Sequence, residues 1–199
     1  MSNPKAIPDE STLNQASELT IYNSKGEEVK FGTLFNEEKT IVIFIRHFFC
    51  GAYVHQLASV KHEALEAASS KIVVIGCGDW AAIRAYAATS TFSGPIYADP
   101  TRKLFHALGM TIETLARTPA GEKRRSYLTT NVFTNAITSI WNGPLKHPSL
   151  IGKQGNISQL GGEFILGPGN TCSFASRMQH TEDHIEIAEI MEKAGVAFP

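Results

Sequence analysis

The sequence predicts an α/β fold, a three-layer sandwich in which helices flank a central mixed sheet. Two runs, residues 39–46 and 71–76, consist largely of β-branched and other apolar residues, as expected of strands buried on both faces. Each run is followed by a segment whose apolar residues recur at helical spacing. This alternation indicates parallel strands joined by right-handed crossovers.

Local signals place the individual elements. Asp79 is suited to cap a helix, Pro100 occupies a first helical position, and Gly109 and Gly195 end helices. The Thr-Glu-Asp sequence at 181–183 is suited to cap the closing helix. The predicted elements, in order, are strands at 18–22 and 39–46, a helix at 53–69, a strand at 71–76, a helix at 80–88, a strand at 95–98, a helix between 99 and 109, a helix at 126–141, a hairpin made of 163–166 and 172–178, and a closing helix at 183–194. This order is typical of a decorated thioredoxin-like fold.

Composition limits the protein to a few classes. A chain of 199 residues with 43% hydrophobic and 19% charged residues fits a flexible segment at 1–17 and a single domain at 18–199. The formal net charge of −1 argues against a nucleic-acid partner. The longest apolar run, 41–45, is too short to cross a membrane. The N-terminus lacks the pattern of a signal peptide, so we expect a cytoplasmic protein.

Cys50 is the candidate nucleophile. It stands between the predicted central strand and the first long helix, so we expect it at the carboxyl edge of the sheet, where open α/β sheets bind ligands. A helix N-terminus and cationic neighbours favour the thiolate there. The alternative is a buried cysteine with a purely structural role.

Several separate motifs carry a family resemblance. They are Arg-His-Phe-Phe-Cys at 46–50, Val-Val-Ile-Gly-Cys-Gly-Asp at 73–79, the stretch from Tyr97 to Met110, Gln-Leu-Gly-Gly-Glu-Phe at 159–164 and Ser-Arg-Met-Gln-His-Thr-Glu-Asp-His at 176–184. Together they resemble the peroxiredoxin-like 2 branch of the alkyl hydroperoxide reductase/thiol-specific antioxidant superfamily. The resemblance implies a thioredoxin-like fold and an antioxidant, thiol-dependent oxidoreductase. It implies a thiol reductant, such as glutathione or thioredoxin, as partner, and it is compatible with a homodimer.

The sequence departs from the family at the reactive position. In the family that this chain resembles, a C-x-x-C pair stands at this point, whereas Gly51, Ala52 and Tyr53 follow Cys50 here. The motif of typical peroxiredoxins is similar to P-x-x-x-T-x-x-C, but in this sequence Ile43 and His47 occupy the proline and threonine positions. Cys50 therefore has no local resolving partner, which a C-x-x-C pair would supply. Cys77, Cys172 or an external thiol are the alternatives that remain.

Cationic side chains surround this region of the sequence. Arg46 and His47 flank Cys50 and could lower its pKa or hold an anion, while Arg177 and His180 precede the closing helix and could complete the site. A salt bridge at the strand end for Arg46, a core position for His47 and surface capping for Arg177 and His180 are the structural alternatives. His180 and His184 have the spacing of a metal pair but lack a third ligand, so we predict no metal and no other cofactor.

Three functions remain open from the sequence. The first is a thiol-dependent oxidoreductase that reduces a peroxide or disulfide through Cys50. The second is a non-redox enzyme that acts on an organic small molecule with acid–base chemistry at Arg46, His47 and Cys50. In that case Phe48, Phe49 and Tyr53 would line the substrate pocket, although aromatic residues at such a junction also occur in cores. The third is a catalytically silent binding protein.

Overall fold

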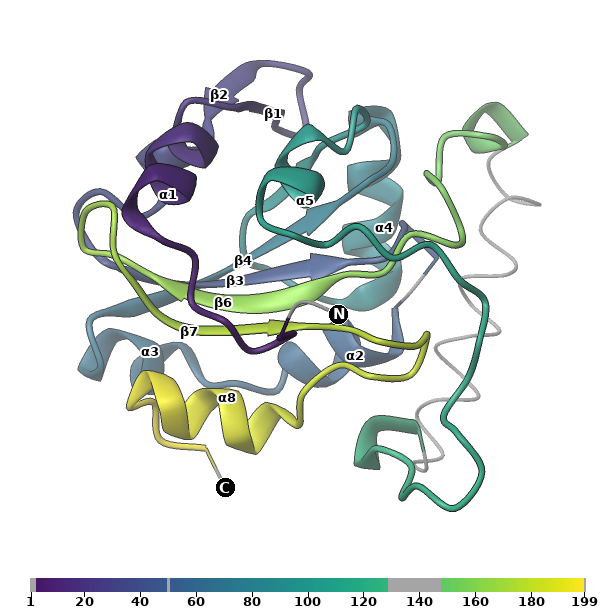
Figure 1. Ribbon diagram of the computed structural model, residues 1–199. Helices are drawn as coiled ribbons and strands as arrows, with labels where there is room; N and C mark the ends of the chain where they lie inside the picture. The colour runs from purple at the N-terminus through teal and green to yellow at the C-terminus, as the bar shows by residue number, and fades with distance from the viewer. Residues whose placement is uncertain (1–2, 50, 129–147, 199) are drawn as a thin grey trace.

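Seven strands form one mixed sheet in the order β2-β1-β5-β4-β3-β6-β7 (Figure 1). The structure, a computed structural model, describes residues 3–49, 51–128 and 148–198. The strands are β1 (Thr20–Tyr22), β2 (Glu28–Lys30), β3 (Lys39–Ile45), β4 (Ser70–Gly76), β5 (Ile96–Ala98), β6 (Gly162–Leu166) and β7 (Cys172–Arg177). The predicted α/β architecture is therefore confirmed.

The strands that precede helices run parallel. β3 pairs with β4 from Lys39 opposite Ser70 to Ile45 opposite Gly76, and β5 lies parallel on the other side of β4. β6 pairs with β3 in the antiparallel sense, as do β7 with β6 and β1 with both β2 and β5. The carboxyl ends of β3 and β4 consequently meet at one edge of the sheet, as the sequence predicts.

Helices cover both faces of the sheet. In Figure 1, α1 (Glu10–Ser17) and α5 (Lys103–Ala107) lie on one face, and α2 (Ala52–Leu57), α3 (His62–Ala67) and α8 (Ile187–Ala194) lie on the other. α4 (Ile83–Ser90) contributes Ile83 and Tyr86 to the same apolar cluster as α2 and α8. The side chains of β3 alternate between two cores, with Ile43 facing α2 and α8 and Phe44 facing α1 and α5.

The N-terminal segment differs from the prediction. Residues expected to be flexible include α1, which Asp9 caps by accepting a hydrogen bond from the Thr12 amide at 2.8 Å. Leu13 and Ala16 are buried in the core of that face. Two apolar positions in an otherwise polar stretch are too few to show the apolar spacing by which a helix is recognised. The edge strand β2 has one partly buried apolar residue, Val29, and was missed for the same reason.

The long helix predicted at 53–69 is two short helices. The amides of Ser59 and Val60 bond to carbonyls three residues earlier, and Lys61 then adopts an extended conformation from which α3 begins. Val60 and Ala64 pack against the same core on either side of this break. Apolar spacing therefore continued across the break and did not reveal it.

The outcomes differ for the two remaining predicted helices, at 126–141 and at 183–194. Of the helix predicted at 126–141, only the turn Ser126–Leu128 falls within the described residues, where it is a 3-10 helix. The closing helix begins at Ile187, four residues later than predicted, because the side chains expected to cap it bind elsewhere. The remaining 3-10 turns are Phe31–Leu34, Trp80–Ala82 and Pro148–Leu150.

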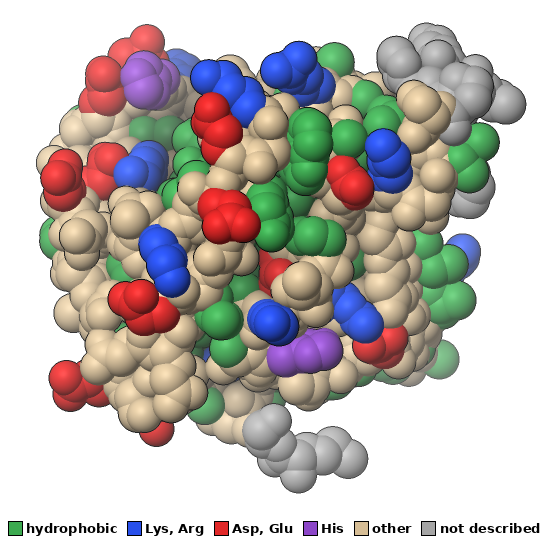
Figure 2. Space-filling model, turned by 90° about the horizontal axis from the view of Figure 1, so that it is seen from above, with side chains coloured by type: hydrophobic (Ala, Val, Ile, Leu, Met, Phe, Trp, Pro, Cys, Tyr) green, Lys and Arg blue, Asp and Glu red, His purple; other side chains and the backbone are tan. Residues whose placement is uncertain are grey.

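The surface of the described part carries mixed charge. Viewed from the side of α1 and α5, basic and acidic side chains are interspersed, with hydrophobic side chains reaching the surface between them (Figure 2). In the ranges that the structure describes, no helix has the length and apolar character needed to cross a bilayer.

Candidate functional site

The segment that follows β3 is held at the carboxyl edge of the sheet by Phe48. Its amide donates a hydrogen bond to the carbonyl of Gln154 at 2.9 Å, and its ring packs 5.3 Å from that of Tyr86. A Cβ at Gly76 would lie 2.6 Å from the Phe48 ring, so only glycine fits at the end of β4. Phe48 is 3% exposed and belongs to the core. Cys50, two residues later, lies outside the described residues.

A loop covers this edge of the sheet. The carbonyl of Lys153 accepts a hydrogen bond from the Asp79 amide at 2.8 Å, and the carbonyl of the next residue binds Phe48. Gly155 approaches the backbone of Cys77 and Gly78 so closely that a Cβ there would lie 2.7 to 2.8 Å from it. No sequence pattern predicted an element in this loop. Its glycine is the signal that marks the close approach.

His47 is a buried residue of this segment. Its Nδ1 accepts a hydrogen bond from the Phe49 amide at 3.2 Å, and the two rings meet edge to face at 6.1 Å. An Nδ1 atom that accepts must hold a lone pair, so the neutral imidazole carries its proton on Nε2. His47 is thereby a hydrogen-bond donor through Nε2.

The two cysteines predicted as possible resolving thiols lie at different ends of the sheet. Cys77 shares the edge with the segment after β3, since its thiol donates to the carbonyl of Arg46 at 2.8 Å. Cys172 begins β7 opposite Leu166, which pairs with Thr40 near the start of β3. Five residues of strand separate Thr40 from Ile45, or about 17 Å at roughly 3.3 Å per residue. The structure therefore brings Cys77, and not Cys172, to the edge where β3 ends.

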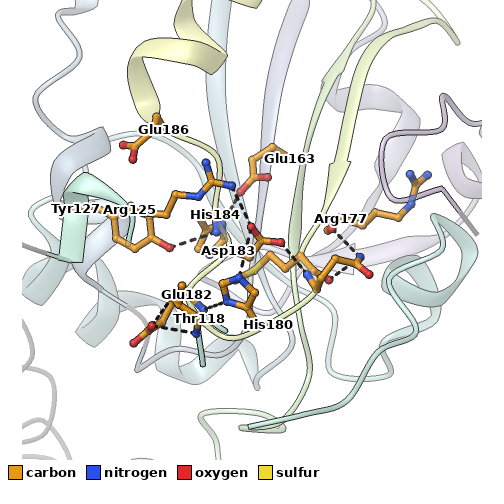
Figure 3. A network of polar contacts seen from close by, with 12 residues as sticks. Thr118, Arg125, Tyr127, Glu163, Arg177, His180, Glu182, Asp183, His184 and Glu186 are labelled. Carbon is orange, nitrogen blue, oxygen red and sulfur yellow. Dashed lines mark hydrogen bonds and ion pairs between the residues drawn. The ribbon is translucent and has the colours of Figure 1, made fainter. Parts of the chain in front are cut away.

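Arg177 serves the opposite face of the sheet. Its guanidinium donates to the carbonyls of Leu108 at 2.6 Å, Pro4 at 3.1 Å and Ala6 at 2.8 Å. It lies 5.2 Å from the centre of the Phe164 ring, which belongs to the core beneath α1 and α5. These contacts fasten the N-terminal segment to the end of α5, apart from the group of residues around His184 (Figure 3).

A buried polar cluster lies under α2 and the chain before α8. Its members are Tyr53, Tyr127, Glu163 and His184 (the polar cluster), each at most 5% exposed. His184 Nδ1 is hydrogen-bonded to Oε1 of Glu163. The Tyr53 ring stacks on the imidazole at 4.3 Å with an interplanar angle of 12°. Tyr127 accepts a hydrogen bond from the His184 amide at 3.2 Å.

Tyr53, expected on the wall of an open pocket, is instead stacked inside the polar cluster. Glu163 and Tyr127 were not predicted from the sequence. A signal for Glu163 was available, because strand alternation puts it on the same face as the buried Ile165. A carboxylate on the buried face of an apolar strand requires a partner, and His184 is that partner.

An outer layer of polar contacts encloses the cluster (Figure 3). Asp183 pairs with Arg125 at 3.0 Å and accepts from the Gln179 amide at 3.0 Å. Glu182 accepts from the Thr118 hydroxyl at 2.7 Å, and Glu186 accepts from the Ser126 amide at 2.8 Å. These bonds occupy the carboxylates that the sequence suggested as helix caps, which explains the late start of α8.

Burial controls the protonation of the cluster. It raises the pKa of the Glu163 carboxyl above its ordinary value, and the imidazole of His184 opposes this change. Burial also raises the pKa of the Tyr53 and Tyr127 phenols, an effect that the charge of Glu163 increases. Both phenols therefore stay neutral at neutral pH.

The histidines near α8 are committed to separate partners. His180 Nδ1 accepts from the Glu182 amide at 3.3 Å, while His184 Nδ1 binds Glu163. Within residues 3–49, 51–128 and 148–198, no three His, Cys, Asp or Glu side chains are arranged around a common metal position.

Comparisons with known proteins agree on one family. A family model described as AhpC/TSA antioxidant enzyme matches residues 56–180. The chain is 32% identical over 186 residues to human peroxiredoxin-like 2C, covering 90% of this chain and 79% of that one. The corresponding protein of Takifugu rubripes is 28% identical over 192 residues, covering 92% and 82% of the two chains.

Solved structures share the fold at low sequence identity. Peroxidoxin BcpB from Mycobacterium tuberculosis superposes with a TM-score of 0.56 at 9% identity, covering 89% of each chain. A mutant of peroxiredoxin 6 from Arenicola marina gives a TM-score of 0.58 at 14% identity, covering 98% of this chain and 72% of that one. The thioredoxin-like fold predicted from the order of elements is thereby confirmed.

Proposed function

Because this chain belongs to the AhpC/TSA antioxidant enzyme family, we propose that it is a thiol-dependent oxidoreductase whose Cys50 thiolate reduces a peroxide. The observation that carries the proposal is the fixed position of the residues before Cys50. Phe48 is bonded to the covering loop at 2.9 Å, and the buried His47 carries its proton on Nε2. Such a donor stabilises a thiolate beside it.

The reaction needs a thiolate, a peroxide and one proton. The Cys50 sulfur attacks the terminal peroxide oxygen, the O–O bond breaks with its electron pair on the leaving oxygen, and that oxygen takes up the proton. The products are a sulfenic acid on Cys50 and an alcohol or water. A thiol then condenses with the sulfenic acid, releasing water, and a second thiol reduces the resulting disulfide.

His47 occupies the position of the threonine in the motif of typical peroxiredoxins. We therefore assign the role of hydrogen-bond donor to an imidazole in place of a hydroxyl. The resolving thiol is either Cys77, whose sulfur lies 2.8 Å from the Arg46 carbonyl, or an external thiol such as glutathione or thioredoxin. Arg46 itself is half-buried at the end of the strand and contributes positive charge to this edge.

A set of cysteine variants tests the proposal. Cys50→Ser is compared with wild type and with Cys172→Ser, whose cysteine lies at the far end of the sheet. We expect Cys50→Ser to abolish hydroperoxide consumption with dithiothreitol as reductant, and Cys172→Ser to retain it. Dimedone labelling followed by mass spectrometry should find the sulfenic acid on Cys50. Full hydroperoxide reduction by Cys50→Ser would overturn the mechanism.

A further inference from the structure

Glu163 and His184 form a buried, hydrogen-bonded pair. Glu163 is fully buried on β6, and His184 is 4% exposed in the chain before α8. One carboxylate oxygen binds Nδ1 of the imidazole. The other oxygen, Oε2, and the imidazole Nε2 are buried and have no hydrogen-bond partner among the described residues.

The number of protons on the pair follows from its burial. A buried pair with a net charge is costly, so the neutral pair is favoured, and it holds one proton more than the anionic pair. That proton lies between Oε1 and Nδ1, on either atom. In both arrangements Nε2 also carries a proton, because the imidazole is either a cation or the Nε2–H tautomer. Loss of the Nε2 proton leaves Nδ1–H bonded to the carboxylate.

Other ionisable groups near the pair are already committed. The phenols of Tyr53 and Tyr127 are kept neutral by burial. Asp183 is paired with Arg125 at 3.0 Å, and Glu186 accepts from the Ser126 amide at 2.8 Å. Of the groups that face one another in this cluster, Glu163 and His184 share the exchangeable proton.

The pair is linked to the proposed reactive cysteine through α2. Tyr53 follows Cys50 by three residues, and its ring stacks on the imidazole of His184 at 4.3 Å. The hydroxyl of Tyr53 is also buried without a partner among the described residues. Three buried polar atoms without partners among the described residues thus lie together, on α2, on β6 and in the chain before α8.

We propose that His184 is the general acid of the Cys50 reaction and that Glu163 is its positioning residue, an inference that rests on the proposed function. As the Cys50 thiolate bonds to the terminal oxygen of a hydroperoxide, the O–O bond breaks and the electron pair moves to the leaving alkoxide. Nε2 gives its proton to that oxygen, so an alcohol leaves. The pair is reprotonated from the next thiol or from solvent, and no further reactant is consumed.

Two oxidants with different leaving groups distinguish an acid from a structural residue. tert-Butyl hydroperoxide expels a basic alkoxide that needs a proton, whereas peracetic acid expels a carboxylate that does not. The enzymes compared carry Cys77→Ser and Cys172→Ser and, in addition, His184→Asn, Glu163→Gln or the control His106→Asn. His106 is a suitable control because it is exposed on α5, which covers the other face of the sheet (Figure 1).

The expected result is a loss that depends on the oxidant. At neutral pH, His184→Asn should slow oxidation of Cys50 by tert-butyl hydroperoxide about a hundredfold, the usual size of a general-acid contribution, and Glu163→Gln should slow it about tenfold. Both variants should change the rate with peracetic acid by less than about threefold. His106→Asn should change neither rate, and alkylation of Cys50 by iodoacetamide should be unchanged in all variants.

A measurement on the unsubstituted pair keeps the test independent of folding. In the parent enzyme the rate of alkylation should rise with pH and level off, whereas the rate with tert-butyl hydroperoxide should fall again once the pair loses its proton. Parallel pH profiles for the two reagents, or equal losses with both oxidants in folded His184→Asn, would overturn the proposal. If the parent enzyme reacts with neither oxidant faster than free cysteine does, the proposed function itself fails.

Discussion

At the scale of single residues, the two tyrosines of the polar cluster have opposite hydrogen-bonding situations. The Tyr127 hydroxyl accepts a hydrogen bond from the His184 amide, whereas the Tyr53 hydroxyl is buried without a partner among the described residues. Both rings pack in the same core, 5.2 Å apart. Removing each hydroxyl while keeping the ring therefore separates the contribution of a buried hydrogen bond to stability from the contribution of aromatic packing.

We expect Tyr127→Phe to lower the free energy of unfolding by about 1 to 3 kcal/mol, because it leaves a buried amide without an acceptor. Tyr53→Phe should change it by less than about 1 kcal/mol, with stabilisation as the favoured direction, because it removes an unpartnered polar group. Urea denaturation of the two variants beside wild type measures both values. Equal destabilisation by the two substitutions would contradict this description of the cluster.

Glu163 makes stability depend on pH. Burial raises its pKa in the folded state above the ordinary 4.5, so the folded protein binds more protons than the unfolded chain between 4.5 and the raised value. The contribution of Glu163 to stability therefore falls as the pH rises through this window. Urea titrations from pH 4.5 to neutrality should show this decline in wild type and a flatter profile in Glu163→Gln. A steeper decline in the variant would show that the sign is wrong.

At the scale of elements, the strands were more predictable than the helices. β3 and β4 were recognised because both of their faces are buried and almost every residue in them is apolar. The start of α8 was misplaced because Glu182 and Asp183 have the sequence of a cap, while in the structure they bind Thr118 and Arg125. Contacts across more than fifty residues are not encoded in local spacing.

The start of the N-terminal segment, residues 4–6, is bound by the side chain of Arg177. Arg177 donates to the carbonyls of Pro4 and Ala6 as well as to Leu108, and α1 follows directly. Arg177→Met should lower the free energy of unfolding by about 2 to 3 kcal/mol, because hydrogen bonds from a charged donor are lost. It should also speed hydrogen exchange and proteolysis within residues 4–8. Arg84→Met, at an exposed position on α4, is the control and should have neither effect.

At the scale of the whole molecule, the topology decides which predicted site residues can meet. The parallel pairing of β3 with β4 puts Cys77 and the segment before Cys50 at one edge, which the sequence predicted from two consecutive strands. The positions of Cys172 and Arg177 depend on how the hairpin of β6 and β7 pairs with β3, and no short-range pattern specifies that register. The polar cluster likewise assembles from α2, β6 and two loops, so it was visible only in the fold.

This topology makes a prediction about disulfides. A disulfide requires Cα atoms about 4.4 to 6.8 Å apart, whereas about 17 Å of strand lies between the end of the sheet that holds Cys172 and the end that holds Cys77. Burial also raises the pKa of the Cys172 thiol to about 11, which leaves little thiolate to react near neutral pH. Peroxide treatment of the folded protein should therefore produce no intramolecular disulfide that contains Cys172.

Peptide mapping of the treated protein by mass spectrometry measures this directly. Treatment in concentrated urea is the control. Unfolding removes Cys172 from the sheet and exposes its thiol, so disulfides that contain Cys172 should then appear. A bond between Cys50 and Cys77 in the folded protein would identify the internal resolving thiol, and its absence would assign that step to an external thiol. A bond from Cys172 to either cysteine under native conditions would require β7 to leave the sheet during turnover, contrary to the role that the topology gives it.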